Sequence, residues 1–201
     1  MHSAVSAHPV SRPRASQRSR QGVAALFQLV LLVLFWAVPA ARAADPQLAS
    51  FEVVQNEEGV LLTYAVNGDL ARSVDDALGK AVPLYFVAEA ELFLERWYWR
   101  DQRVASAVRI WRIVYQPLTS TYRVTFSGLS QNYNSREEAF AAISRTSRWK
   151  IAEPGQLTDG SRHYVEFSYR LDTSLLPRPM QIGIGGQADW NYAVQRVQRL
   201  N

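Results

Sequence analysis

Histidine, cysteine and paired acidic residues carry much of enzymatic chemistry, and this sequence offers few of them. The chain has no cysteine and three histidines, of which only His163 lies beyond the first 43 residues. Zinc sites built from Cys and His, a Cys–His couple and haem attachment through cysteine are therefore excluded. His163 lies in an alternating strand pattern without a Gly-x-Ser-x-Gly motif, so we expect an exposed strand histidine rather than part of a catalytic triad.

Glu89 and Glu91 are the candidates for carboxylate chemistry, because residues two apart on a strand share one face. A carboxylate-based hydrolase needs two acids that face each other across a cleft, and no such pair is evident. We expect Arg109 or Arg112 to lie nearby and to neutralise these acids. The sequence therefore favours a protein that is not an enzyme, with no catalytic residues, no metal and no cofactor.

Aromatic and cationic residues point to a different chemistry, the recognition of a partner or ligand by an exposed surface. Trp97 and Trp99 are two residues apart, and the second patterned segment adds Arg109, Trp111 and Tyr115. Interface hot spots are enriched in Trp, Tyr and Arg, so we predict that these five residues form an aromatic binding stripe. The alternative is that a helix or a loop covers the rings and makes them part of the core.

Residues 1–43 have the pattern of a secretory signal peptide. An Arg-bearing polar segment precedes an apolar run at 23–38, and Ala41-Arg42-Ala43 supplies the small residues of a cleavage site before Ala44. The pattern predicts export to the periplasm with removal of the leader. An uncleaved inner-membrane anchor is the alternative, although the run is short against the roughly 20 residues that cross a bilayer.

The basic character of the chain belongs to this leader. It holds five arginines and no acidic residue, which leaves 22 − 5 = 17 basic residues against 18 acidic ones in the remainder. A nucleic-acid partner is therefore not expected.

Residues 44–201 are expected to form a single β-rich domain. Segments 48–54 and 60–66 predict a hairpin, and segments 84–100 and 104–116 predict a longer hairpin that turns at Asp101-Gln102-Arg103. Two short helices are predicted behind capping boxes that begin at Ser73 and Ser135. Further strands are expected at 122–126, 149–152 and 164–171. The fold class is mainly β, an antiparallel β-sandwich or strongly twisted sheet of about seven strands with two short helices.

The register of the long hairpin decides which residues face the core. If Arg100 faces Val104, the numbers of facing residues sum to 204, and Glu95 meets Arg109. A two-residue turn with a sum of 203 is the alternative. The preferred register predicts one core face, which consists of Phe86, Ala88, Ala90, Leu92 and Leu94 with Val108, Ile110 and Val114.

Three segments, at 96–101, 111–119 and 171–179, together with Asp189-Trp190, resemble an exported proteobacterial family. That family is known only as a domain of unknown function and is sometimes labelled a proline-rich signal peptide protein. The resemblance implies no reaction, cofactor or catalytic residue. Its genes often lie beside those of a nitrogen-regulation-type sensor kinase, which implies an envelope-sensing context. In the 171–179 segment, we expect Pro177 and Pro179 to hold an extended corner between strands.

Together these observations favour a non-enzymatic periplasmic binding or accessory module. A membrane-bound sensor, or another envelope protein, is the partner that the resemblance implies, and membrane contact is expected only through an uncleaved leader. The alternatives are a carboxylate-based hydrolase and a structural envelope protein anchored in the inner membrane.

Overall fold

The computed structural model describes residues 45–158, 160–184 and 187–200, and these described residues form one compact unit. The predicted signal peptide at 1–43 and its cleavage site lie outside the described residues. Within the described part, nine strands form two antiparallel sheets, and three α-helices accompany them. The mainly β class is confirmed, whereas the finer description as a β-sandwich stays a prediction. None of the described helices is long and apolar enough to cross a membrane.

The smaller sheet has the strand order β1-β2-β7, with β1 at Gln47–Asn56, β2 at Gly59–Asn67 and β7 at Arg145–Ala152. The predicted hairpin of β1 and β2 is confirmed, and Asn56 faces Gly59 across its turn. Gly59 has a φ of 116°, and a Cβ there would lie 2.2 Å from the carbonyl oxygen of Ala152, so this turn requires glycine.

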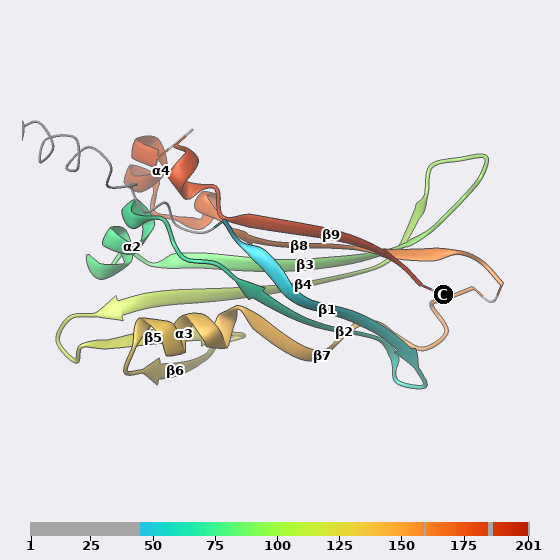
Figure 1. Ribbon diagram of the computed structural model, residues 1–201, viewed down its shortest axis with the longest axis horizontal. Helices are drawn as coiled ribbons and strands as arrows, with labels where there is room; N and C mark the ends of the chain where they lie inside the picture. The colour runs from blue at the N-terminus through green and yellow to red at the C-terminus, as the bar shows by residue number, and fades with distance from the viewer. Residues whose placement is uncertain (1–44, 159, 185–186, 201) are drawn as a thin grey trace, which may run out of the picture. The chain divides into compact units, whose positions relative to one another are not determined.

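The larger sheet has the strand order β6-β5-β4-β3-β8-β9 (Figure 1). Strands β3, β4, β5 and β8 correspond to predicted segments. Strands β6 and β9 were not predicted, because their sequences LSQNY and AVQRVQR are polar and mostly exposed. The bounds of these strands are β3 Leu84–Leu94, β4 Gln102–Gln116, β5 Thr121–Phe126, β6 Leu129–Tyr133, β8 His163–Leu171 and β9 Ala193–Arg199.

The predicted register of the β3–β4 hairpin is wrong. Leu84 faces Ile113 and Leu92 faces Ala105, so the facing numbers sum to 197 rather than 204. An odd sum places the odd-numbered residues of β4 beside the even-numbered residues of β3. The core face of β3 is confirmed from Phe86 to Leu92, but on β4 it consists of Trp111 and Ile113, while Val108 and Ile110 are exposed.

The predicted helix starts are confirmed only in part. Helix α3 (Arg136–Ile143) begins as predicted, with the Ser135 hydroxyl accepting from the Glu138 amide. Helix α2 (Arg72–Gly79) has Ala71 rather than Ser73 at its N-cap, so that capping box is wrong. Helix α4 (Arg178–Ile184) follows Pro177, and the predicted extended corner is wrong there, because a first helical turn tolerates proline.

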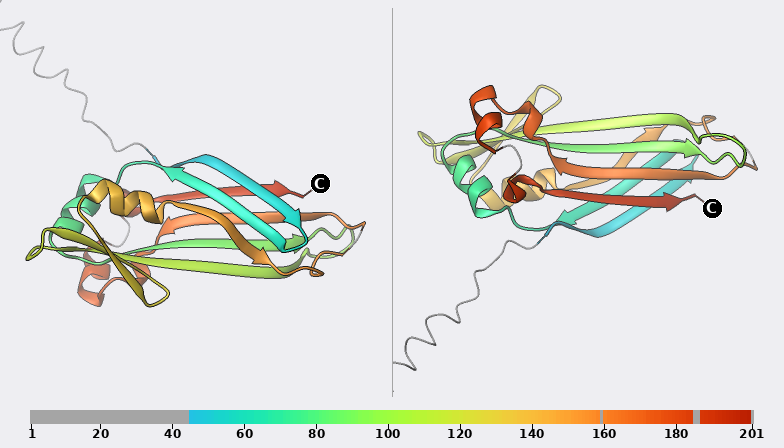
Figure 2. Two further views of the ribbon diagram at one scale, coloured as in Figure 1. Left: turned by 90° about the horizontal axis from the view of Figure 1, so that it is seen from below. Right: turned by 90° about the horizontal axis from the view of Figure 1, so that it is seen from above.

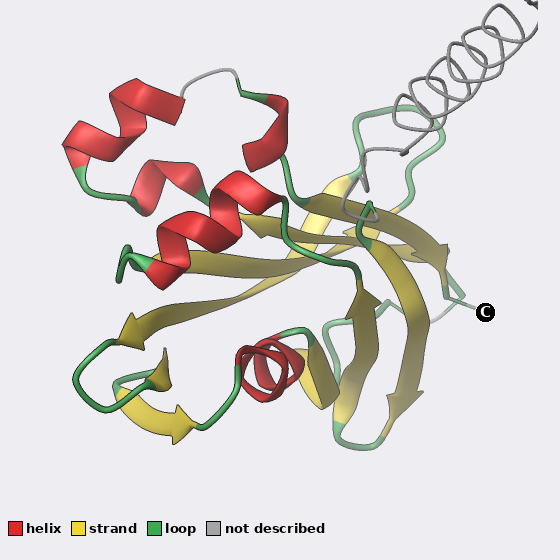
Figure 3. Ribbon diagram, turned by 60° about the vertical axis from the view of Figure 1, so that its left-hand side comes forward, coloured by secondary structure: helices red, strands yellow, loops and turns green. Residues whose placement is uncertain are grey.

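The core lies between the two sheets, with β1 and β2 running across one face of the larger sheet (Figure 2). Tyr64 of β2 contacts Phe167 of β8 at a ring distance of 4.6 Å, and Phe51 of β1 lies 5.3 Å from the same ring. Helices α2 and α4 gather at one end of the sheets (Figures 1 and 3), with the short 3-10 helices η1 (Thr173–Leu175) and η2 (Ala188–Trp190). The β3–β4 connection lies at the other end.

Candidate functional site

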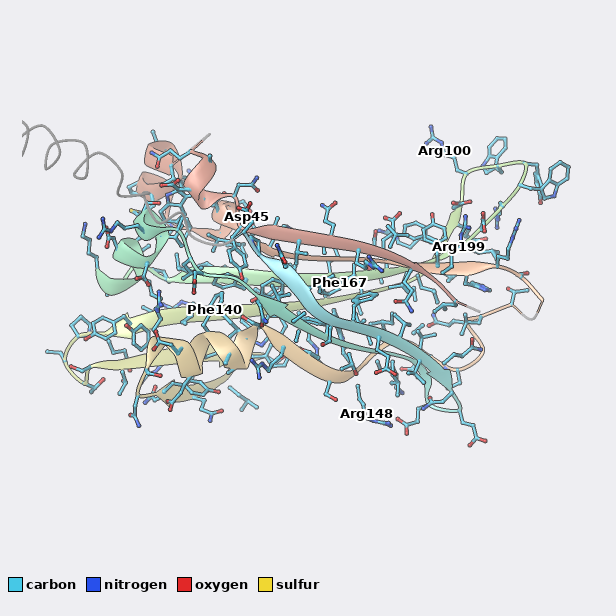
Figure 4. The ribbon with its side chains drawn as sticks, in the orientation of Figure 1. Asp45, Arg100, Phe140, Arg148, Phe167 and Arg199 are labelled. Atoms are coloured by element: carbon cyan, nitrogen blue, oxygen red, sulfur yellow. The ribbon has the colours of Figure 1, made fainter. Side chains whose placement is uncertain are left out.

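The connection between β3 and β4, residues 95–101, is here called the tip loop. It projects from the end of the larger sheet (Figure 1), and Figure 4 shows Arg100 on its outer side. Trp97 is 90% exposed, Tyr98 68% and Trp99 74%. Large rings are seldom left so open, because each exposes a broad apolar area to water.

The tip loop is closed by the side chain of Asp101. One carboxylate oxygen accepts the backbone amide of Arg96 at 2.9 Å, and the other accepts the Tyr164 hydroxyl of β8 at 2.8 Å. The Tyr164 ring stacks on Phe93 of β3 with centroids 5.3 Å apart. The Glu95 amide donates to the Arg162 carbonyl at 2.9 Å. The base of the loop is therefore tied to β8, although its three rings are open to solvent.

These contacts shift the pKa values of both partners. The backbone amide of Arg96, and then the Tyr164 hydroxyl, hold the pKa of Asp101 below its usual 3.8. Burial, and then the Asp101 carboxylate, raise the pKa of Tyr164 to about 12. At neutral pH the carboxylate is thus ionised and the phenol is protonated, which is the combination that the hydrogen bond needs.

The strand ends at the base of the tip loop are rich in arginine. Residues Phe93, Arg103, Tyr164 and Arg199 form one row across four neighbouring strands. The side chain of Glu95 lies 3.4 Å from Arg162 and 3.5 Å from Arg199. From this row outward to the loop, the described residues carry the cations Arg96, Arg100, Arg103, Arg162 and Arg199 and the anions Glu95 and Asp101, and Glu91, on the inner side of the row, pairs with Arg103.

The predicted aromatic stripe does not form on one strand face. Trp97 and Trp99 lie on the tip loop and not on a strand, whereas Trp111 is only 5% exposed. The Trp111 ring stacks on Phe126 of β5 at 5.4 Å within the core. The structure therefore separates the tryptophans, because the odd register sum turns Trp111 to the core side of β4.

Arg109 and Tyr115 also lie away from the tip loop. The Arg109 guanidinium is half-buried and lies 5.4 Å from the Phe126 ring centre and 5.1 Å from that of Trp149. Burial lowers the pKa of Arg109, and Tyr64 opposes that shift. Tyr115 is half-buried and packs on Tyr122 at 4.9 Å. Arg109 and Tyr115 thus pack against residues of neighbouring strands. Of the five predicted binding residues, only Trp97 and Trp99 lie together on the tip loop.

Sequence reasoning missed Tyr98, Arg96 and Arg100 as parts of the same loop, and it missed Asp101 as the residue that closes it. The role of Asp101 could have been predicted from the sequence, since Asp is a preferred loop residue whose carboxylate accepts hydrogen bonds from nearby backbone amides. It was overlooked because segment 84–100 was interpreted as strand to its end.

The acidic face of β3 is neutralised, but not by the predicted arginines. Glu89 pairs with Arg170 at 3.1 Å, and Glu91 pairs with Arg103. Glu91 faces Glu166 of β8, and both line a shallow groove of about 330 Å³. His163 is not exposed as predicted. It is 4% exposed, its Nε2 lies 3.4 Å from the Thr158 amide and its Nδ1 lies 3.2 Å from the Ser161 carbonyl.

A second cavity, of about 240 Å³, lies between the end of β2 and helix α3. Its charged lining includes Asp69, Arg136 and Arg145, and Arg136 is already paired with Asp75 at 2.9 Å. Among the residues that the structure describes, no cluster of His, Asp and Glu is suited to hold a metal ion. The tip loop is therefore the feature that offers the most exposed recognition chemistry.

Comparison with known proteins identifies one family. The model of the family described as Domain of unknown function (DUF4390) matches residues 43–200. No curated protein and no solved structure matches the chain. The matched range includes all of the described residues, and therefore the tip loop.

Proposed function

The chain belongs to this family of unknown function, and we propose that it is an exported, non-enzymatic binding or accessory module of the cell envelope that recognises its target through the tip loop. The observation that carries this proposal is the exposure of Trp97, Tyr98 and Trp99 on a loop that Asp101 holds closed. Exposed rings on a fixed base lose little conformational entropy on binding, so their burial contributes to affinity.

Export is supported by the leader pattern of residues 1–43, and a periplasmic location follows from it. A membrane-bound sensor is the partner class that the gene neighbourhood of the family implies. An uncleaved leader would instead anchor the protein in the inner membrane. Intact-mass measurement on protein recovered from the periplasm distinguishes the two, because cleavage predicts a chain that starts at Ala44 and an anchor predicts full-length protein in the membrane fraction.

Binding is tested by sedimentation of the protein with native envelope membranes. Replacing Trp97 and Trp99 together by Ala is expected to abolish retention, because most of the exposed ring surface is removed. The matched control replaces Leu118, on the β4–β5 turn, and Leu129, at the start of β6, together by Ala; both are exposed apolar residues away from the tip loop, and this variant should be retained like the parent. All variants carry the same N-terminus, so a difference between them reports on the tip loop. Equal retention of both double variants would contradict the proposal.

A carboxylate-based hydrolase is the second candidate, because Glu91 and Glu166 face each other in one groove. The pairing of Glu91 with Arg103 disfavours it, since the guanidinium occupies the carboxylate that would have to face the substrate. Hydrolysis of a glycoside by the parent that disappears in Glu166→Gln would favour the enzyme over the binding module.

A further inference from the structure

We propose, as an extension that rests on the proposed function, that the target of the tip loop is the headgroup region of an anionic phospholipid bilayer. The first reason is the type of the exposed residues. The loop exposes two tryptophans and one tyrosine. These two residue types are enriched where a membrane meets water, because each ring has an apolar body and a polar group that stays hydrated.

The second reason is the charge beneath the rings. Among the described residues, the row that contains Phe93 and Tyr164 and the segments beyond it towards the loop carry five arginines. Arg103 is paired with Glu91, and Arg162 and Arg199 share Glu95, so the excess positive charge is that of Arg96 and Arg100 on the loop itself. The Asp101 carboxylate is already occupied by the Arg96 amide and the Tyr164 hydroxyl. This excess of positive charge complements an anionic surface, which attracts arginines that lie close to it.

The third reason is the form of the site. The rings lie on three consecutive residues of a projecting loop, and the Trp97 and Tyr98 rings meet edge to face at 5.1 Å. All three rings are open to solvent on a loop that projects from the sheet, so a rigid protein surface would need a matching hollow to contact them all. A headgroup layer is soft and accepts rings from several directions to a depth of about 5–10 Å. The bonds made by Asp101 keep the loop closed as it enters that layer.

The test measures binding of the protein to sedimented vesicles, one set made of equal parts phosphatidylglycerol and phosphatidylcholine and one of phosphatidylcholine alone. The parent should bind the anionic set and bind the neutral set much more weakly. Replacing Arg96 and Arg100 together by Ala should weaken binding roughly thirtyfold, the equivalent of two arginines at about 1 kcal/mol each. Replacing Trp97 and Trp99 by Ala should weaken it at least about tenfold.

The matched charge control replaces Arg72 and Arg178, two exposed arginines at the helical end of the sheets, and should bind like the parent. Thermal unfolding of every variant verifies that each one is folded. Native membranes, before and after protease treatment, form the second arm. Binding to anionic vesicles and to protease-treated membranes, lost only in the tip variants, supports the proposal.

Two results overturn it in different ways. If the tip variants lose binding to native membranes while the parent binds neither vesicles nor protease-treated membranes, the target is a protein, and the proposed function stands without the lipid. If the tip variants bind native membranes as the parent does, or the parent binds none, both the lipid inference and the proposed function fail.

Discussion

At the scale of single residues, Asp101 distinguishes the tip loop from an ordinary hairpin connection. Its two oxygens join the start of the loop to β8, and the Arg96 amide is the main cause of its lowered pKa. A lowered pKa means that the folded loop is stabilised by the ionised carboxylate. That stabilisation is complete above the ordinary pKa of 3.8 and is lost as the pH falls through the lower folded value.

We therefore predict that the Arg96 amide loses protection from hydrogen exchange as the pH falls below 3.8, after correction for intrinsic exchange. In Asp101→Ala the protection should be low at every pH, because the acceptor is gone. The amide of Ala90 in the core of β3 serves as the control and should stay protected. If the Arg96 and Ala90 amides lose protection over the same pH range, the loop opens only when the whole domain unfolds, which contradicts the prediction.

The tryptophans provide a second prediction at this scale. Trp111→Ala should lower the free energy of unfolding by about 3–5 kcal/mol, because a buried ring leaves a cavity. Trp99→Ala should change it by no more than about 0.5 kcal/mol, because the ring is open to solvent. Denaturant titration of both variants gives the two values. A large loss for Trp99→Ala would show that the tip loop is part of the folding core.

At the scale of elements, the β3–β4 hairpin determines which residues become site and which become core. Its odd register sum buries Trp111 and exposes Ile110. The chain has no natural cysteine, so an introduced pair can report on this register without interference.

Glu91 and Ser106 face each other on the open side of the hairpin. We predict that the double variant Glu91→Cys, Ser106→Cys forms a disulfide under mild oxidation, because facing residues are within the reach of a disulfide. The matched control Glu91→Cys, Ile110→Cys lies on the same face but out of register and should not close. Mass spectrometry of the oxidised proteins shows in which of the two variants the disulfide has formed. Preferential closure of the control pair would contradict the register.

Much of the fold followed from sequence pattern, and the site followed only in part. Alternation along β3 correctly predicted its buried face, and the β1–β2 turn was confirmed at Gly59. The pairing of β3 with β4 was predicted wrongly because β3 ends at Leu94 and residues 95–101 form the connection, whereas the sequence pattern suggested strand to Arg100 and a tight turn. Strand β6 was not predicted because its residues are polar and mostly exposed, so the backbone pairing with β5, and not burial of apolar side chains, makes this segment a strand.

At the scale of the molecule, the two sheets meet through aromatic residues whose polar groups are poorly satisfied. Tyr64 and Tyr169 are buried with rings 6.1 Å apart. Among the described residues neither hydroxyl has a hydrogen-bond partner in standard geometry, although Thr146 lies close to the first and Ser144 to the second. Burial raises the pKa of Tyr64 to about 12 and raises that of Tyr169 well above its usual value of 10. These hydroxyls weaken the contact between the sheets, since a buried polar group without a partner costs about 1–3 kcal/mol.

Tyr169→Phe should therefore keep or increase the free energy of unfolding, by up to about 1 kcal/mol, because it removes an unsatisfied hydroxyl and keeps the ring. Phe167→Ala, in the same strand, should cost about 3–5 kcal/mol and serves as the control for core packing. Chemical denaturation of both variants provides the comparison. A loss of about 2 kcal/mol or more in Tyr169→Phe would show that its hydroxyl has a partner that stabilises the core.

The division of the molecule into a packed core and an exposed tip loop is tested most directly by quenching of tryptophan fluorescence with acrylamide. In the free protein, Trp97 and Trp99 should be quenched strongly, whereas the buried Trp111 should not. Addition of native envelope membranes should protect the two exposed indoles, and the variant Trp97→Phe, Trp99→Phe should show no such protection. Sedimentation of the parent with those membranes while its exposed indoles stay fully open to acrylamide would contradict the assignment of the tip loop as the binding element.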